Sequence, residues 1–109
     1  MRTYYCNQIN KSLLDKDVQV AGWVNKIRDH GGVIFIDLRD IKGIVQAVIN
    51  PDDLELFNLA ESIRSEFIIS ISGKPRLRPD GSENVNIDSG KVEIVASKIE
   101  ILSKAETPP

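Results

Sequence analysis

The chain has 109 residues, which is enough for one domain and too few for two. Sixteen acidic and fourteen basic residues give a formal net charge of −2, so the surface as a whole is not that of a general polyanion binder. Cys6 is the only cysteine and His30 the only histidine, which excludes an internal disulfide and a zinc site built from Cys and His. No apolar run approaches the roughly 20 residues of a membrane span, and no signal-peptide pattern follows Met1. We therefore expect a cytoplasmic protein without membrane contact.

Alternating apolar residues predict three strands in the first half of the chain. The first strand covers residues 18–28, and Gly22 inside it predicts a bulge or a sharp bend. The second strand covers residues 33–39, and its even-numbered residues form an apolar face. The other face of this strand carries Phe35, Asp37 and Arg39. A short turn follows, so a third strand over 44–49 is expected to pair with the second as a hairpin.

A helix is predicted to follow the third strand. Asn50 can cap it, Pro51 suits its first position, and two acidic residues lie in the first turn. Apolar residues then recur at helical spacing, and we expect the helix to end near Glu66.

The second half of the chain predicts two long strands. A fourth strand runs over 67–72 and continues to Arg78, and a polar loop over 79–90 separates it from a fifth strand over 92–102. The apolar parity changes within the fifth strand, which predicts a bulge near 96–98. Five strands with one helix between the third and fourth are typical of a five-stranded OB-fold, a Greek-key β-barrel. An SH3-like barrel and an open five-stranded α+β sheet are the alternatives.

Side chains on the predicted outer face indicate a binding site. Phe35 lies on the polar face of its strand, where a base can stack on its ring, although single exposed aromatic residues are also common without a role. Gln46 has the parity opposite to its apolar neighbours, so its amide can read a base edge. Basic residues end the first and fourth strands, whereas the helix is acidic. These basic residues are Lys26, Arg28, Lys74, Arg76 and Arg78. Such a face suits single-stranded nucleic acid, and oligosaccharide binding is possible from the same residues.

The segment from Gly22 to Asp40, GWVNKIRDHGGVIFIDLRD, closely resembles the N-terminal segment of bacterial-type aspartyl-tRNA synthetases. The Trp-Val and Ile-Asp-Leu-Arg-Asp pieces also occur in asparaginyl and lysyl relatives, whereas Arg-Asp-His-Gly-Gly and the ending Ala-Glu-Thr-Pro-Pro are more typical of the aspartyl group. The resemblance implies an OB-fold anticodon-binding domain over residues 1–104. It also implies that residues 105–109 begin a linker to a class II catalytic domain outside this chain.

The resemblance further implies which partners and cofactors to expect. The parent protein would be an aspartate–tRNA ligase, a homodimer whose catalytic domain uses ATP and Mg²⁺. The 109-residue chain alone would be a monomer with no catalytic residue, no metal site and no cofactor. Its partner would be the anticodon loop of aspartate tRNA, whose anticodon is GUC.

By the same resemblance, eight residues would contact the anticodon loop, seven described here and the eighth, His30, below. Phe35 would stack on the central U and Gln46 would hydrogen-bond to it. Three arginines would hold the loop through phosphates and neighbouring bases: Arg28, Arg76 and Arg78. Two residues would contact the first base, Asn84 and Glu93, with Glu93 accepting from a guanine edge.

Three positions differ from the usual pattern of the family or vary within it. Lys26 and Ile27 stand where relatives commonly carry arginines, so backbone contacts there would be weaker. His30 resembles a histidine of bacterial members that charge both aspartate tRNA and asparagine tRNA, whose anticodon is GUU. A loop histidine that caps a turn is the alternative interpretation.

Two further functions remain open from the sequence. One is a free-standing or sequence-tolerant single-stranded nucleic-acid-binding OB-fold module. The other is a protein-interaction module that uses Trp23 or Phe35 as an anchor.

Overall fold

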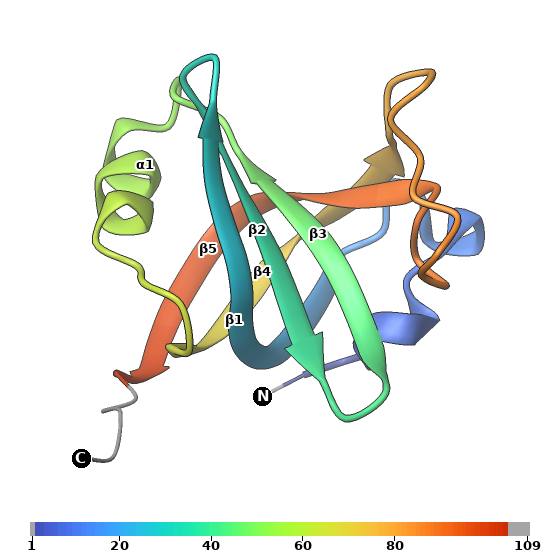
Figure 1. Ribbon diagram of the computed structural model, residues 1–109, viewed down its shortest axis with the longest axis horizontal. Helices are drawn as coiled ribbons and strands as arrows, with labels where there is room; N and C mark the ends of the chain where they lie inside the picture. Colours follow the sequence, from blue (N-terminus) through green and yellow to red (C-terminus); the bar gives the residue numbers. More distant parts are fainter. Residues whose placement is uncertain (1, 105–109) are drawn as a thin grey trace.

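The computed structural model describes residues 2–104, in which five strands form a closed barrel in the order β1-β2-β3-β5-β4 (Figure 1). One helix, α1 (Leu54–Glu61), lies between β3 and β4, and two short 3₁₀ helices, η1 (Cys6–Gln8) and η2 (Lys11–Leu13), precede the barrel. The strands are β1 (Val18–His30), β2 (Val33–Asp40), β3 (Gly43–Ile49), β4 (Ile68–Leu77) and β5 (Val92–Ser103). This arrangement confirms the predicted OB-fold and excludes an open sheet. The linker predicted over 105–109 lies outside the described residues.

Strand β1 takes part in two ladders of the barrel. Its first half, from Val18 to Trp23, pairs with β4, and its second half pairs with β2 as far as His30. The sequence predicted a bulge or a sharp bend at Gly22, and the register shift on β1 lies beyond this residue, between Val24 and Lys26. Gly22 is instead a point of close approach, because a Cβ there would overlap the carbonyl oxygen of Arg39 on the neighbouring strand.

The predicted bulge in the last strand is confirmed. Pairing between β4 and β5 shifts register after Ser72, so that Ser72 faces Lys98 and Gly73 faces Ala96, with Ser97 left over. The backbones approach closely at this point, and a Cβ on Gly73 would overlap the carbonyl of Val95. The extra residue bends β5, and such bends allow a small sheet to close into a barrel.

Helix α1 is shorter at both ends than the sequence predicted. Asp53, not Asn50, is the N-cap, and its side chain accepts a hydrogen bond from the backbone N–H of Leu56 at 3.1 Å. The helix ends at Glu61 rather than near Glu66. The reason lies in the tertiary fold, since the backbone N–H of Glu66 donates to the carbonyl of Val24 on β1 at 2.8 Å. This hydrogen bond pairs the chain with β1 at Glu66, and β4 continues the same pairing from Ile68.

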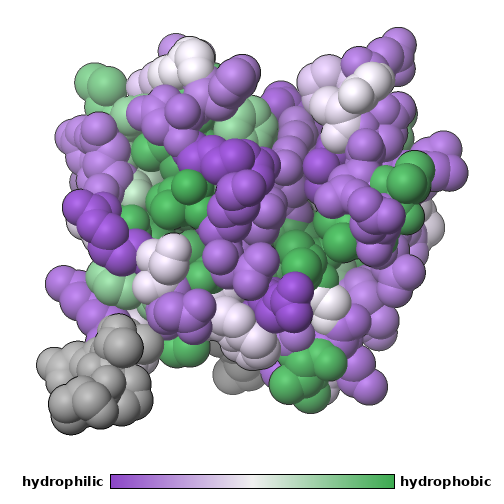
Figure 2. Space-filling model, in the orientation of Figure 1, coloured by the Kyte–Doolittle hydropathy of each residue, from purple (hydrophilic) through white to green (hydrophobic). Residues whose placement is uncertain are grey.

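A single apolar core fills the barrel. In Figure 1, α1 and the 3₁₀ helices lie on opposite sides of the barrel. Helix α1 buries Leu56 and Ala60, whereas η1 buries Cys6 completely. Burial raises the pKa of the Cys6 thiol, so this group stays neutral and packs as a small apolar side chain. Polar side chains cover most of the face drawn in Figure 2. Within residues 2–104, no helix is both long and apolar enough to cross a membrane.

The close approach at Gly73 gives a test of barrel closure. We expect Gly73→Ala to lower the free energy of unfolding by about 2–3 kcal/mol, because the added methyl group must push β4 away from β5. Urea denaturation followed by circular dichroism measures this change. Ser65→Ala, at an exposed position, is the control and should stay within about 0.5 kcal/mol of the parent chain. Equal stability of the two variants would show that the strands do not meet at Gly73.

Candidate nucleic-acid interface

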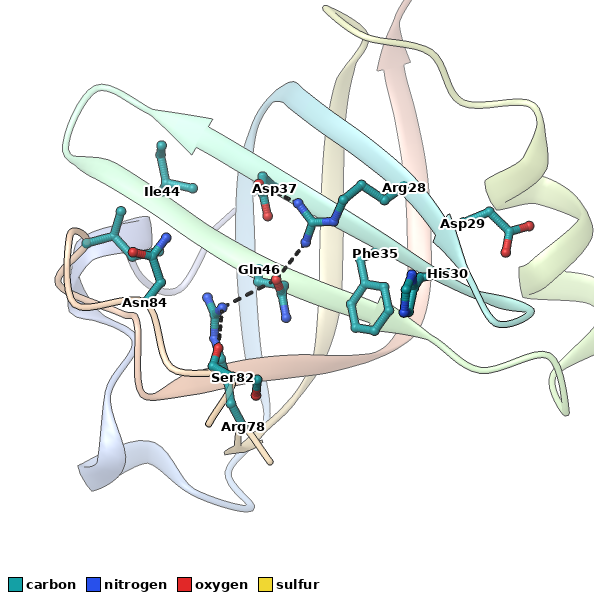
Figure 3. Close-up of a pocket in the computed structure, with 11 residues that line it drawn as sticks. Arg28, Asp29, His30, Phe35, Asp37, Ile44, Gln46, Arg78, Ser82 and Asn84 are labelled. Carbon is teal, nitrogen blue, oxygen red and sulfur yellow. Dashed lines mark hydrogen bonds and ion pairs between the residues drawn. The ribbon is translucent and has the colours of Figure 1, made fainter. Parts of the chain in front are cut away.

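A cavity of about 610 Å³ opens on the outer face of the barrel, between the β1–β2–β3 strands and the segment 79–91 (Figure 3). Its wall includes six of the eight residues predicted to contact an anticodon loop. These six are Arg28, His30, Phe35, Gln46, Arg78 and Asn84. The sequence had placed Phe35 and Gln46 on one face by strand alternation alone, and the structure confirms that placement.

Strand register brings the central side chains together. Arg28 on β1 lies opposite Phe35 on β2, and Asp37 on β2 lies opposite Gln46 on β3. Alternate residues of a strand point to the same face, so Phe35 and Asp37 both project outward from the barrel. Asp37 was not named as a site residue, although it has the same parity as Phe35 and could have been found from it.

Arg28 is fixed by two partners in the cavity. Its guanidinium donates to the Asp37 carboxylate at 3.2 Å and to the Gln46 amide oxygen at 2.9 Å. The guanidinium carbon lies 5.7 Å from the centre of the Phe35 ring, within the range of a cation–π contact. The ring and the charge therefore form one preorganised unit before any ligand arrives.

Arg78 has a different environment from the other arginines, because its side chain is buried. Only 9% of the residue is exposed, and its Nε donates to the carbonyl of Val92 at 3.0 Å. One terminal nitrogen lies 3.4 Å from both the Gln46 amide oxygen and the carbonyl of Ser82. Burial lowers the pKa of this guanidinium, and the nearby Glu93 carboxylate opposes that effect. Arg78 thus joins β5 and the segment 79–91 to Gln46.

Glu93 and Arg76 lie behind the cavity wall rather than in it. They face each other across the β4–β5 ladder, and Arg76 Nε donates to Glu93 Oε2 at 2.9 Å. Gln46 Nε2 donates to the other carboxylate oxygen of Glu93 at 2.8 Å. Glu93 is 2% exposed, whereas the Arg76 side chain is 46% exposed. The structure therefore connects both residues to the cavity through Gln46.

The segment 79–91 forms the remaining wall and is tied to the barrel. The Ser89 hydroxyl donates to the carbonyl of Ile44 on β3, and within the segment the backbone N–H of Asn84 donates to the carbonyl of Gly90. Ser82 and Ile87 also line the cavity. Sequence reasoning missed these two residues, because no strand or helix periodicity fixes the direction of side chains in such a segment.

His30 lies at the tip of the β1–β2 hairpin, exposed and beside Phe35 in Figure 3. The turn that follows it consists of Gly31 and Gly32, whose φ angles of 63° and 82° favour glycine. Among residues 2–104 the imidazole has no hydrogen-bond partner. The structure therefore gives no support to the alternative in which His30 caps the turn. The ring is free to face a ligand in the cavity.

The charges of the site are more balanced than the sequence indicated. Asp37 and Glu93 pair with two of the three arginines, and Asp29 also lines the cavity. Directed hydrogen bonds and an aromatic face, more than net positive charge, therefore define this surface. Within residues 2–104, no group of three metal-ligating side chains could hold a metal ion.

Comparison with known proteins assigns the chain to a family. Residues 18–102 match the tRNA anti-codon family, described as an OB-fold nucleic acid binding domain. The chain belongs to this family. A crystal structure of asparaginyl-tRNA synthetase from Pyrococcus horikoshii, complexed with asparaginyl-adenylate, is 28% identical with a TM-score of 0.79, over 97% of this chain and 23% of that one. This anticodon-binding OB-fold domain therefore spans less than a quarter of that synthetase.

Two other structures show how widely this fold is used. The OBody AM3L15 bound to hen egg-white lysozyme is 28% identical with a TM-score of 0.83, over 100% of this chain and 96% of that one. Aspartyl tRNA synthetase from Entamoeba histolytica is 22% identical with a TM-score of 0.82, over 95% of this chain and 22% of that one, and shows the fold alone.

The buried position of Arg78 predicts a structural cost when it is replaced. We expect Arg78→Met to lower the free energy of unfolding by about 2–3 kcal/mol, because the carbonyl of Val92 loses its donor inside the protein. Arg39→Met removes the same charge from an exposed position of β2 and should change stability by less than about 0.5 kcal/mol. Chemical denaturation of both variants makes the comparison, and a loss no larger for Arg78→Met would contradict the role of Arg78 as an anchor.

Proposed function

We propose that this chain is the anticodon-binding domain of an aspartate–tRNA ligase and that its cavity binds the GUC anticodon loop of aspartate tRNA. The observation that carries the proposal is the open cavity in which the Phe35 ring, the Arg28 guanidinium and the Gln46 amide converge. An aromatic face beside directed polar groups is the arrangement by which proteins hold an unstacked base. Family membership and the resemblance of residues 22–40 to aspartyl-tRNA synthetases support the choice of RNA.

In this proposal the central U of the anticodon stacks on Phe35 and bonds to Gln46. Asn84, on the opposite wall, contacts the first base, and the exposed terminal nitrogens of Arg76 contact a phosphate. Glu93 accepts from the guanine edge only if the base reaches behind Gln46, since its side chain is 2% exposed and does not line the cavity.

His30 is the residue proposed to face the third base. It lies at the hairpin tip beside Phe35, and the third base follows the central one along the loop (Figure 3). Aspartate and asparagine tRNAs differ at that base, so His30 would decide whether GUU is accepted along with GUC.

The whole enzyme is likewise part of the proposal. The catalytic domain would lie outside this chain, activate aspartate with ATP and Mg²⁺, and transfer it to the tRNA. The similarity of this chain to under a quarter of the Pyrococcus horikoshii enzyme is consistent with such a parent. We propose a cytoplasmic, homodimeric parent and a monomeric domain.

Titration with three labelled anticodon stem-loops tests the proposal: GUC, GUU and a loop with the central U replaced. We expect the dissociation constant to rise strongly when the central base changes, at a fixed and stated salt concentration. Equal binding of GUC and GUU would support dual acceptance, whereas preference for GUC would support aspartate tRNA alone. Equal binding of all three loops would favour a sequence-tolerant single-strand binder instead. Binding of none would favour a protein partner.

Phe35 gives a second measurement on the same loops. We expect Phe35→Ala to weaken binding of the GUC stem-loop by about 1–3 kcal/mol, because the central base loses its stacking surface. Val85→Ala, on the segment 79–91 and 93% exposed, is a control outside the cavity wall and should bind as the parent chain does. An unchanged affinity of Phe35→Ala would remove this ring from the interface.

A further inference from the structure

The outer face of β2 continues past the cavity to an exposed arginine. Phe35, Asp37 and Arg39 alternate along this strand and therefore point to the same side. The first two line the cavity, whereas Arg39 lies outside it, opposite Ile44 of the cavity wall in the β2–β3 register. In Figure 3, Ile44 lies at the end of the cavity away from His30. Arg39 therefore extends the outer face beyond that end, and no ion pair engages its guanidinium within residues 2–104.

Two more exposed cations lie around one aromatic ring next to the end of β2. The Arg2 guanidinium carbon lies 3.8 Å from the centre of the Tyr5 ring, and Lys42 Nζ lies 5.8 Å from the same centre. Lys42 belongs to the turn between β2 and β3, and Arg2 belongs to the segment that precedes η1. Cation–π attraction favours keeping both side chains near the ring despite their like charge. We call Arg2, Arg39 and Lys42 the basic strip.

Asp40, the last residue of β2, fixes the backbone around the basic strip. Its Oδ2 accepts from the backbone N–H of Cys6 at 2.8 Å, and its Oδ1 accepts from those of Lys42 at 2.8 Å and Gly43 at 3.0 Å. The segment that carries Tyr5 is thereby joined to the turn that carries Lys42 (Figure 1). Within the described residues Asp40 forms no ion pair with the basic strip, because its carboxylate is engaged by backbone donors.

The basic strip differs from the cavity in its balance of charge. At the cavity, Asp37 pairs with Arg28, and Glu93 behind the wall pairs with Arg76. The strip has three cations and one nearby carboxylate, that of Asp40, so its net charge is positive. Phosphates bind where positive charge gathers, whereas bases are read by directed polar groups. The domain therefore has a cavity suited to bases and an adjoining surface suited to phosphates.

The position of the basic strip defines which part of an RNA it can contact. In the proposed function the first anticodon base contacts Asn84 and the third base faces His30. Asn84 lies at the same end of the cavity as Ile44 in Figure 3, so the RNA on the 5′ side of the anticodon leaves the cavity at that end. Gly43, the first residue of β3, lies about 10 Å along the strand from Gln46. This separation places the strip beyond the anticodon, beside nucleotides on its 5′ side.

We propose that the basic strip is a second RNA-contact surface, which binds phosphates of the nucleotides on the 5′ side of the anticodon. This inference rests on the proposed function and adds to it a contact outside the anticodon. Contacts between cations and phosphates carry no sequence information, so the strip raises affinity and fixes the direction of the RNA chain. Discrimination between bases remains with the cavity.

A triple variant of the strip tests the proposal through the salt dependence of binding. Arg2→Gln, Arg39→Gln and Lys42→Gln together should raise the dissociation constant of the GUC stem-loop about tenfold at low salt. The slope of the logarithm of the association constant against that of the salt concentration should become shallower by about 2, since each phosphate contact contributes roughly 0.7–0.9. The ratio of the dissociation constants for the GUC loop and the loop with the central U replaced should stay that of the parent chain.

A matched triple variant controls for the change in net charge. Lys11→Gln, Lys16→Gln and Lys98→Gln together remove the same charge from exposed positions outside the strip and the cavity. This control should keep a salt slope close to that of the parent chain. Circular dichroism should show both variants folded, because all of the replaced side chains are exposed.

Uncharged phosphate analogues test the direction of the RNA chain without a change in the protein. One GUC stem-loop carries methylphosphonates on the 5′ side of the anticodon, and a second carries the same number on the 3′ side. The parent chain should bind the 5′-modified loop more weakly than the 3′-modified loop. Modification on the 5′ side should cost the strip variant little, because the charges that contact those phosphates have been removed. The comparison on the parent chain is sufficient by itself if the strip variant does not fold.

The outcomes separate this inference from the proposed function. An unchanged salt slope in the strip variant would overturn the inference, and so would equal or greater sensitivity of the parent chain to modification on the 3′ side. A changed central-base ratio in the strip variant would overturn the division between the strip and the cavity. Loss of base discrimination in the parent chain would overturn the proposed function alone, because neither the slope nor the analogue comparison depends on which base is read.

Discussion

A single buried carboxylate connects the closure of this barrel to the face that carries the cavity. Glu93 lies on β5, the strand between β3 and β4, and accepts hydrogen bonds from Gln46 on one side and Arg76 on the other. An ionised group in a nearly dry position is tolerated only when it is paired and hydrogen-bonded. The burial of Glu93 therefore requires Gln46 and Arg76 to lie where they do. The direction of the Gln46 amide follows from this requirement.

Strand positions and the faces of side chains were predictable from the sequence, because the two-residue repeat of a strand is a local property. Phe35 and Gln46 were assigned to one face in this way, and a change of parity located the bulge at Ser97. Boundaries decided by contacts distant in sequence were not predictable. Asn50 and Asp53 are both good caps, and the choice between them is made in the folded chain. The end of α1 depends on a hydrogen bond between Glu66 and Val24, which no local pattern reveals.

The candidate site was predictable as a set of residues but not as a network. Counting charges along the sequence indicated a basic face, whereas the structure pairs Arg28 with Asp37 and Arg76 with Glu93. Arg78 illustrates this difference between a set of residues and a network. Its sequence position is compatible with a phosphate contact, whereas its burial and its hydrogen bond to Val92 indicate a structural role. The interface consequently depends on the direction of its hydrogen bonds, and such directions arise only when strands far apart in sequence are in register.

The double pairing of β1 has a consequence for how the domain forms. Because one continuous strand belongs to the ladders with both β2 and β4, neither half of the barrel can separate without breaking β1 itself. Opening should therefore be all-or-none, with slow amide hydrogen exchange spread across both ladders rather than confined to one half. The pairing of Val18 with Gly73 also joins distant parts of the chain. Closing the loop between them costs conformational entropy before the contacts of the paired strands stabilise the fold. Such a topology places folding in the millisecond-to-second range typical of small β-barrels.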